Sequence, residues 1–286
     1  MDSQTDFILT LSCADKPGIV FAVSGFLVEQ NCNIVDSQQH RDPQTGQFFM
    51  RVSFAAPRPR PAADSISGAF RPIASRFAMT WRIYDAAVPP RMAILVSKFQ
   101  HCLNDLLYRV EIGALPVTVP VIVSNHPDAA PRAASHGIRF EHLPVTQATK
   151  AEQEAKLTTL LAEEKIELVV LARYMQVLSP ELCGKLEGNV INIHHSFLPS
   201  FRGAKPYGQA YARGVKLIGA TAHYVTADLD EGPIIEQDVA RVDHADGPQD
   251  LVHIGRDVEC LVLARAVSLH VERRVLLNGM KTVVFR

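Results

Sequence analysis

Short apolar segments separated by turn-forming residues mark the first 85 or so residues of the chain. Asp6–Cys13 is rich in large apolar residues and predicts a strand. Asp15-Lys16-Pro17-Gly18 is a turn sequence, and the apolar spacing after it predicts a helix from Ile19 to about Gln30. The pattern continues as strand, strand, helix and strand, over Asn31–Gln39, Phe48–Ala55, Ser65–Arg76 and Met79–Tyr84. The order βαββαβ predicts a ferredoxin-like unit.

The pattern changes at about Met92, where apolar strands begin to alternate with longer amphipathic segments. This alternation is typical of a mostly parallel, Rossmann-like sheet covered by helices. The predicted strands are Met92–Ser97, Val119–Ser124, Ile138–Glu141, Leu168–Ala172, Val190–His194, Lys216–Thr226 and Ile234–Val242, and the longest predicted helices are Thr149–Glu164 and about Pro248–Arg273. The tail Val275–Val284 predicts a hairpin on an Asn-Gly turn. Because Val88-Pro89-Pro90 looks like a linker, we expect two domains, 1–86 and 87–286, in an α/β protein.

Composition narrows the function classes. Lys and Arg number 29 against 30 Asp and Glu, so a net charge of -1 gives no basis for binding nucleic acid. The sequence contains no apolar run long enough for a membrane helix and no export signal at its beginning. The five cysteines are scattered and odd in number, which favours a reducing cytoplasm. Phosphate-binding Gly-Lys-Ser/Thr, dinucleotide and two-histidine metalloprotease motifs are all missing from the sequence.

A dense polar group lies at the end of a predicted buried strand. Asn192-Ile193-His194-His195-Ser196 arrives at the carboxyl edge of the sheet, where open parallel sheets bind ligands. Side chains alternate along a strand, so Asn192 and His194 should share one face, with His195 on the other. An amide and an imidazole would then share a site, although such a pair also occurs as a purely structural strand cap.

A second polar group follows in a later strand and its loop. Thr221 and His223 should share one strand face, and Asp230 comes shortly after, before Gly232-Pro233. Taken alone, this run is more often a solvated turn than part of a site. Combined with the first group it supplies an amide, a histidine and a carboxylate, which acyl transfer requires. We expect no metal site, because His194 and His195 should diverge and no third ligand beside His223 is evident.

These two groups resemble the folate-dependent formyltransferase domain, and the likeness runs from about Met92 onward. It rests on Asn192–Pro199, Gly219–Val225 and Leu229–Ile235. The resemblance implies that Asn192, His194 and Asp230 are catalytic and that Thr221 and His223 support Asp230 and the substrate. It further implies that the loop containing Tyr174, Met175, Val177 and Leu178 forms the slot for the folate ring, although core packing would explain these apolar residues equally well.

The first predicted domain resembles an ACT domain at Asp15-Lys16-Pro17-Gly18-Ile19-Val20. The two resemblances together imply a deformylase branch that hydrolyses 10-formyltetrahydrofolate to formate and tetrahydrofolate, with the folate as substrate and no tightly bound cofactor. They also imply a homo-oligomer and an amino-acid effector, glycine or methionine, bound near Asp15 and Gly18. The alternative is that this domain only dimerises or tethers the chain.

Two other functions stay open. The first is formyl transfer to an acceptor such as glycinamide ribonucleotide, as in the purine-pathway relative. That relative has a Gly-rich phosphate loop after its first strand, whereas this chain has Ser97–Asn104 without glycine, in which only Lys98 or His101 could compensate. The second is a non-catalytic amino-acid sensor, which the presence of all three candidate catalytic residues disfavours. Gly208 departs from the resemblance, because a histidine is common there.

Overall fold

The computed structural model describes residues 5–198 and 206–286 and divides into two compact units. One unit comprises the residues up to Pro89 together with Glu272–Arg286, and the other comprises Pro90–Val271. Each unit has its own apolar core. Within the described residues, no helix has both the length and the apolar character needed to cross a membrane.

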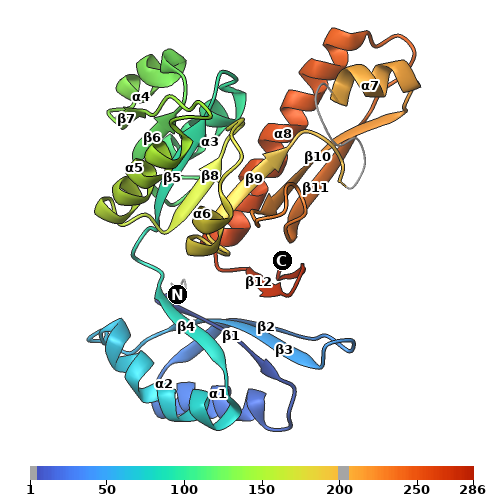
Figure 1. Ribbon diagram of the computed structural model, residues 1–286. Coiled ribbons are helices and arrows are strands. Elements are labelled where there is room, and N and C mark those ends of the chain that lie inside the picture. Colours follow the sequence, from blue (N-terminus) through green and yellow to red (C-terminus); the bar gives the residue numbers. More distant parts are fainter. Residues whose placement is uncertain (1–4, 199–205) are drawn as a thin grey trace. The chain divides into compact units, whose positions relative to one another are not determined.

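The first unit is an antiparallel sheet with the strand order β2-β3-β1-β4, packed against two helices (Figure 1). The chain order confirms the predicted βαββαβ pattern, as β1 (Phe7–Ala14), α1 (Ile19–Glu29), β2 (Asn33–Arg41), β3 (Gln47–Ala55), α2 (Ala63–Phe77) and β4 (Thr80–Asp85). Phe70 of α2 packs edge-on against both Phe26 of α1 and Trp81 of β4, and these rings join the helices to the sheet. The second strand begins two residues later than predicted, because Asn31 takes a left-handed conformation at the end of α1.

The C-terminal hairpin of β12 (Val275–Asn278) and β13 (Lys281–Val284) packs within the first unit. Arg51 of β3 donates two hydrogen bonds to the carbonyl oxygen of Glu272, and Asn278 donates one to the carboxylate of Asp42 at 2.6 Å. The predicted second domain, 87–286, included this segment. An Asn-Gly turn predicts a hairpin but does not show which unit the hairpin packs against. The contact between the hairpin and the first unit therefore could not be predicted from the local sequence.

The second unit is a seven-stranded sheet with the order β11-β10-β9-β8-β5-β6-β7. Five strands are parallel, as predicted: β5 (Arg91–Val96), β6 (Thr118–Ser124), β7 (Arg139–His142), β8 (Leu168–Leu171) and β9 (Val190–His194). The strands β10 (Leu217–Tyr224) and β11 (Ile234–Arg241) extend the sheet in antiparallel fashion. After β5 the chain adds β6 and then β7 on one side of it, and β8 then pairs with the other side of β5. This reversal between β5 and β8 is where open α/β sheets hold their ligands.

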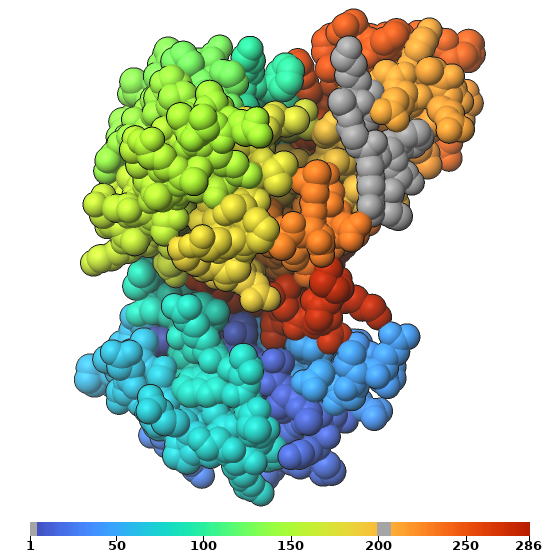
Figure 2. Space-filling view, in the orientation of Figure 1, coloured from blue at the N-terminus to red at the C-terminus, as the bar shows by residue number. Residues whose placement is uncertain are grey.

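Helices cover the sheet of the second unit, and every residue of Met92–Val96 in its central strand is fully buried. The helices are α3 (His101–Glu111), η1 (Pro127–Ala129), α4 (Ala130–Ser135), α5 (Lys150–Glu163), α6 (Pro180–Lys185), α7 (Pro206–Arg213) and α8 (Pro248–Val271). In the space-filling view, the green residues that include α4 and α5 form the left part of the visible face of this unit (Figure 2). The predicted helix Thr149–Glu164 is α5 and the long helix predicted at about Pro248–Arg273 is α8, which ends at Val271.

Candidate active site

A cavity of about 570 Å³ opens at the carboxyl ends of β8 and β9. Its wall comes from segments far apart in sequence: the loop after β8, the end of β9, the loop between β10 and β11, and the helices α3, α7 and α8. Asn192, His194 and Asp230 all contribute to this wall. The structure therefore brings together the amide, the imidazole and the carboxylate that the sequence nominated, at the edge of the sheet where a ligand was expected.

Strand pairing places Asn192 beside a second histidine. His223 of β10 lies opposite Asn192 of β9, and its Nε2 is 3.2 Å from the amide nitrogen of Asn192. The other ring nitrogen, Nδ1, lies 2.8 Å from the carbonyl oxygen of Tyr224 and donates to it. A neutral His223 ring with its proton on Nδ1 then accepts one N–H of Asn192 through Nε2. Among the described residues the second N–H of Asn192 has no hydrogen-bond partner, and Asn192 lies on the wall of the cavity.

His194 and Asp230 form the charged pair of the site. The imidazole Nδ1 lies 3.2 Å from Asp230 Oδ2 and donates to the carboxylate. His194 Nε2 is buried and makes no hydrogen bond among the described residues. Burial alone would raise the pKa of Asp230, but the hydrogen bond from His194 outweighs it and holds this pKa well below its usual range. Asp230 is therefore an anion at neutral pH.

The loop that carries Asp230 is held close to β10. Asp230 has a left-handed backbone (φ 56°), which costs an aspartate less than most residues. A Cβ at Gly232 would overlap the carbonyl oxygen of Tyr224, so only glycine lets the loop approach this closely. The backbone N–H of Tyr224 donates a hydrogen bond to the carbonyl oxygen of Pro233 at 2.9 Å. These constraints fix the carboxylate beside the two histidines.

The four residues expected to form the folate slot all line the cavity, in two different ways. Tyr174 and Leu178 are buried and belong to the apolar core under the sheet. Met175 and Val177 are 56% and 53% exposed, so their side chains contribute little to packing of the core. Exposed apolar side chains beside a polar site favour ligand contact over a core role.

Thr221 does not line the cavity, contrary to its expected role beside Asp230 and the substrate. It is fully buried, donates to the carbonyl of Ser196 at 2.9 Å, and accepts from the backbone N–H of Leu198 and from Gln237. The segment that follows β9 folds over it. Thr221 therefore anchors that segment, which alternation along β10 alone could not reveal.

His195 also differs from the expectation, which placed it on the opposite face from His194. The strand β9 ends at His194, so the alternation stops there. Both histidines line the cavity, with ring centres 4.9 Å apart. Burial, together with the charge of Arg173, lowers the pKa of His195 to about 4, so the ring is neutral at pH 7.

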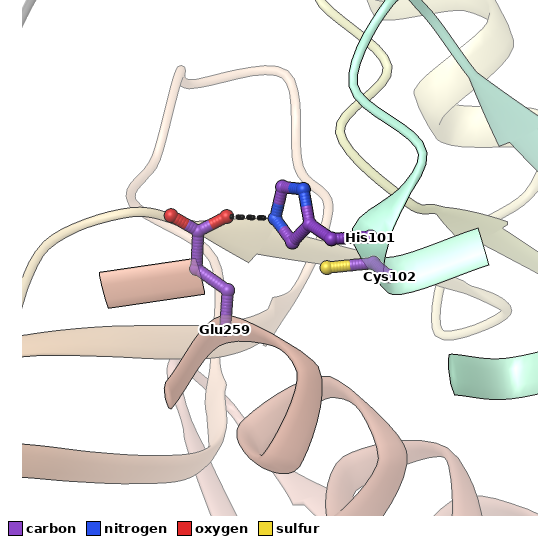
Figure 3. A group of neighbouring side chains, drawn as sticks. All are labelled: His101, Cys102 and Glu259. Atoms are coloured by element: carbon purple, nitrogen blue, oxygen red, sulfur yellow. Dashed lines mark hydrogen bonds and ion pairs between the residues drawn. The ribbon is translucent and has the colours of Figure 1, made fainter. Parts of the chain in front are cut away.

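Two residues in the wall of the cavity escaped the sequence reasoning, Tyr207 and Glu259, and they lie beside His101 and Arg173. Glu259 lies in α8, is 1% exposed, and accepts from His101 Nε2 at 2.7 Å (Figure 3). The Tyr207 hydroxyl donates to its other oxygen at 2.6 Å, and Arg173 Nε lies 3.4 Å from Oε2. We call these residues the Glu259 cluster. One feature of the sequence could have revealed this cluster. Glu259 is a lone acidic residue beside the apolar run Cys260–Ala264, and a buried carboxylate requires partners.

The donor atoms of His101, Cys102 and Glu259 lie within 4.8 Å of one another, which raises the question of a metal ion (Figure 3). Two features of the group argue against one. The guanidinium of Arg173, whose Nε lies 3.4 Å from Glu259 Oε2, would repel a cation. A hydrogen bond with Cys260, together with burial, raises the pKa of the Cys102 thiol well above its usual value, so the thiolate that a metal requires is disfavoured.

Comparisons with known proteins agree with this geometry. A formyl transferase family profile matches residues 90–267, and an ACT domain profile matches residues 7–67. The chain is 50% identical to the formyltetrahydrofolate deformylase of Corynebacterium sp. over the whole of both chains. It is 48% identical to that of Bacillus subtilis, over 97% of this chain and 93% of the relative. The chain belongs to the formyltetrahydrofolate deformylase family.

Solved structures of two kinds match this chain, one over nearly all of it and the other over 71% of it. A formyltetrahydrofolate deformylase from Burkholderia mallei is 54% identical and superposes with a TM-score of 0.95, over 99% of this chain and all of that one. A glycinamide ribonucleotide transformylase from Symbiobacterium toebii is 29% identical and superposes with a TM-score of 0.66, over 71% of this chain and 97% of that one. The deformylase family thus shares one fold with these transferases and adds an ACT domain to it.

The two residues expected to bind an effector lie at the start of α1 in the first unit. Gly18 caps this helix with a left-handed backbone (φ 91°), and the carboxylate of Asp15 pairs with Arg41 at 2.8 Å. In the second unit, Gly208 is an exposed residue of α7, and a Cβ there would meet no atom within 4 Å. A larger side chain at this position would therefore meet no clash at its Cβ.

Proposed function

We propose that this chain hydrolyses 10-formyltetrahydrofolate to formate and tetrahydrofolate, in the cavity at the end of β9. The observation that carries this proposal is the convergence of Asn192, His194 and Asp230 on one wall of that cavity. Membership of the deformylase family supports the same reaction. Five free cysteines and the absence of a disulfide among them fit a reducing cytoplasm as the compartment.

The chemistry follows from the hydrogen bonds of the three side chains. Attack of water on the formyl carbon puts negative charge on the formyl oxygen, and the free N–H of Asn192 and a protonated His194 Nε2 are the donors that stabilise it. Asp230 is ionised and accepts a proton from the attacking water. The C–N bond then breaks, the folate nitrogen takes up that proton by way of His194 or Asp230, and formate leaves.

The direct test is an assay of purified protein with 10-formyltetrahydrofolate, in which formate is measured with and without glycinamide ribonucleotide. We expect formate at the same rate in both cases. Formyl transfer seen only when the ribonucleotide is present would contradict the proposal in favour of the transferase. A protein with neither activity would favour the amino-acid sensor.

Substitution of Met175 tests the folate slot. Because this side chain is largely exposed and lines the cavity, we expect Met175→Ala to raise KM for the folate severalfold and to change kcat and thermal stability little. Met280→Ala is the matched control, an exposed methionine in the hairpin of the other unit. Equal loss of activity and stability in Met175→Ala would instead indicate core packing.

The ACT domain supports amino-acid binding, and we propose glycine or methionine as the effector, near Asp15 and Gly18. We also propose that pairs of these domains make the protein a homo-oligomer, since α1 exposes Phe21 and Val28. Calorimetric titration with each amino acid should show heat of binding in the native chain and none in an Asp15→Ala variant. Absence of heat from both amino acids in the native chain would contradict an effector role.

A further inference from the structure

The Glu259 cluster is a built feature of the cavity wall rather than a chance contact. Its members come from four separate segments: the start of α3, the loop after β8, α7 and α8. A Cβ at Gly255, one helical turn before Glu259, would overlap the ring of Tyr207, so the missing side chain makes room for that ring. Arg173 has a left-handed backbone (φ 65°), which is unfavourable for arginine by about 1 kcal/mol. The fold maintains this arrangement against a local cost.

The cluster leaves little capacity to bind a further charged group. Both oxygens of Glu259 accept hydrogen bonds, one from His101 and one from Tyr207, and Arg173 lies beside the first of them. Although burial would raise the pKa of Glu259, the hydrogen bond from His101 and the charge of Arg173 lower it, so the residue is an anion. The positive charge of the guanidinium is thereby committed to a group of the protein itself.

The carboxylate of Glu259 lies beside the side chains of the first two residues of α3. His101 is the first residue of α3, and the donor atoms of His101, Cys102 and Glu259 lie within 4.8 Å of one another. Backbone N–H groups at a helix start are a common binding site for phosphate. Here the protein's own carboxylate lies beside that turn, in the loop region where Ser97–Asn104 lacks the glycines of a phosphate cradle.

The cluster also borders the catalytic residues. The ring of His195 lies between them, with its centre 4.9 Å from that of His194 and 6.2 Å from that of Tyr207. If the folate occupies the slot beside Met175 and Val177, an acceptor amine has to approach the formyl carbon from the part of the cavity lined by α3, α7 and α8. That part contains the Glu259 cluster.

We propose that the Glu259 cluster closes the acceptor side of the cavity to phosphate-bearing amines and so makes water the acceptor of the formyl group. This inference rests on the hydrolysis proposed above. A phosphate entering this region would meet a buried carboxylate and would find the guanidinium already paired, whereas water needs neither charge nor much space. The preference for water over a phosphate-bearing amine would then have two causes. Glu259 repels the phosphate, and Ser97–Asn104 lacks the glycines of a phosphate-binding loop.

The test is the double variant Arg173→Gly/Glu259→Gln, which removes both buried charges together and puts the residue best suited to φ 65° at position 173. With 10-formyltetrahydrofolate and glycinamide ribonucleotide, we expect the yield of formylated ribonucleotide to rise about tenfold or more over the native chain. In that transfer the acceptor nitrogen bonds to the formyl carbon, the bond from this carbon to the folate nitrogen breaks, and the proton of the acceptor goes to the folate nitrogen. Arg139→Gly/Glu141→Gln is the matched control, an ion pair on β7 outside the cavity, and should give no such product.

A folded double variant that still releases formate but formylates no more ribonucleotide than the native chain would overturn the inference. A second measurement applies if the double variant does not fold. Because the native cavity is closed to the ribonucleotide, about 1 mM of it should leave the native rate of formate release unchanged. Competitive inhibition by the ribonucleotide would overturn the inference, while absence of formate release without any acceptor would instead contradict the proposed hydrolysis.

Discussion

Replacement of Asp230 by asparagine should lower kcat for formate release by about a thousandfold, within the range typical of a lost general acid or base. Asparagine keeps the size of the side chain but cannot accept a proton from water. It also removes the negative charge that holds the proton on His194 Nδ1 at 3.2 Å. Because the pKa of Asp230 lies well below its usual range, the native residue is ionised throughout the neutral pH range, and the loss should be seen across it.

The matched control is Asp238→Asn, a residue of β11 that pairs with Arg265 and does not line the cavity. We expect this variant to retain native kcat. Steady-state kinetics with circular dichroism on both proteins separates a chemical loss from a folding defect. Near-native turnover in a folded Asp230→Asn protein would remove this residue from the reaction.

Replacement of Asn192 by alanine should cost about 3 to 4 kcal/mol of transition-state stabilisation, or two to three orders of magnitude in kcat. The amide is already oriented by its bond to His223 Nε2, so its second N–H needs little further ordering to act as a donor in the cavity. Since the donor acts mainly on the transition state, KM for the folate should change much less than kcat.

Asn189→Ala provides the comparison for this variant, because Asn189 is an exposed residue just before the same strand. Its amide bonds only locally, to the carbonyl of Glu187. We expect native kinetics from it. A rise in KM for Asn192→Ala with unchanged kcat would assign the amide to substrate binding in place of oxyanion stabilisation.

The strands could be predicted because their apolar patterns are local. The three candidate catalytic residues could be predicted because they belong to one motif. The strand β9 has the predicted bounds, Val190–His194, and its period of two places Asn192 and His194 together on the cavity wall. Asp230 was predictable only by resemblance, since nothing in the loop sequence alone separates a catalytic acid from a solvated turn.

Other features could not be predicted from the sequence, because they depend on contacts between segments that are far apart in the chain. The role of Thr221 depends on the chain after β9 folding over it. The position of His195 depends on where β9 stops. The Glu259 cluster joins residues that are up to 158 positions apart, so no window of sequence contains it.

The hairpin formed by the last residues gives the chain an unusual order of assembly. During synthesis on the ribosome, Arg51 and Asp42 emerge long before Glu272 and Asn278, the groups that bond them in the finished protein. The whole of Pro90–Val271 is made in between. A nascent chain can form its first sheet early, but Arg51 and Asp42 acquire these bonds only when translation is nearly complete.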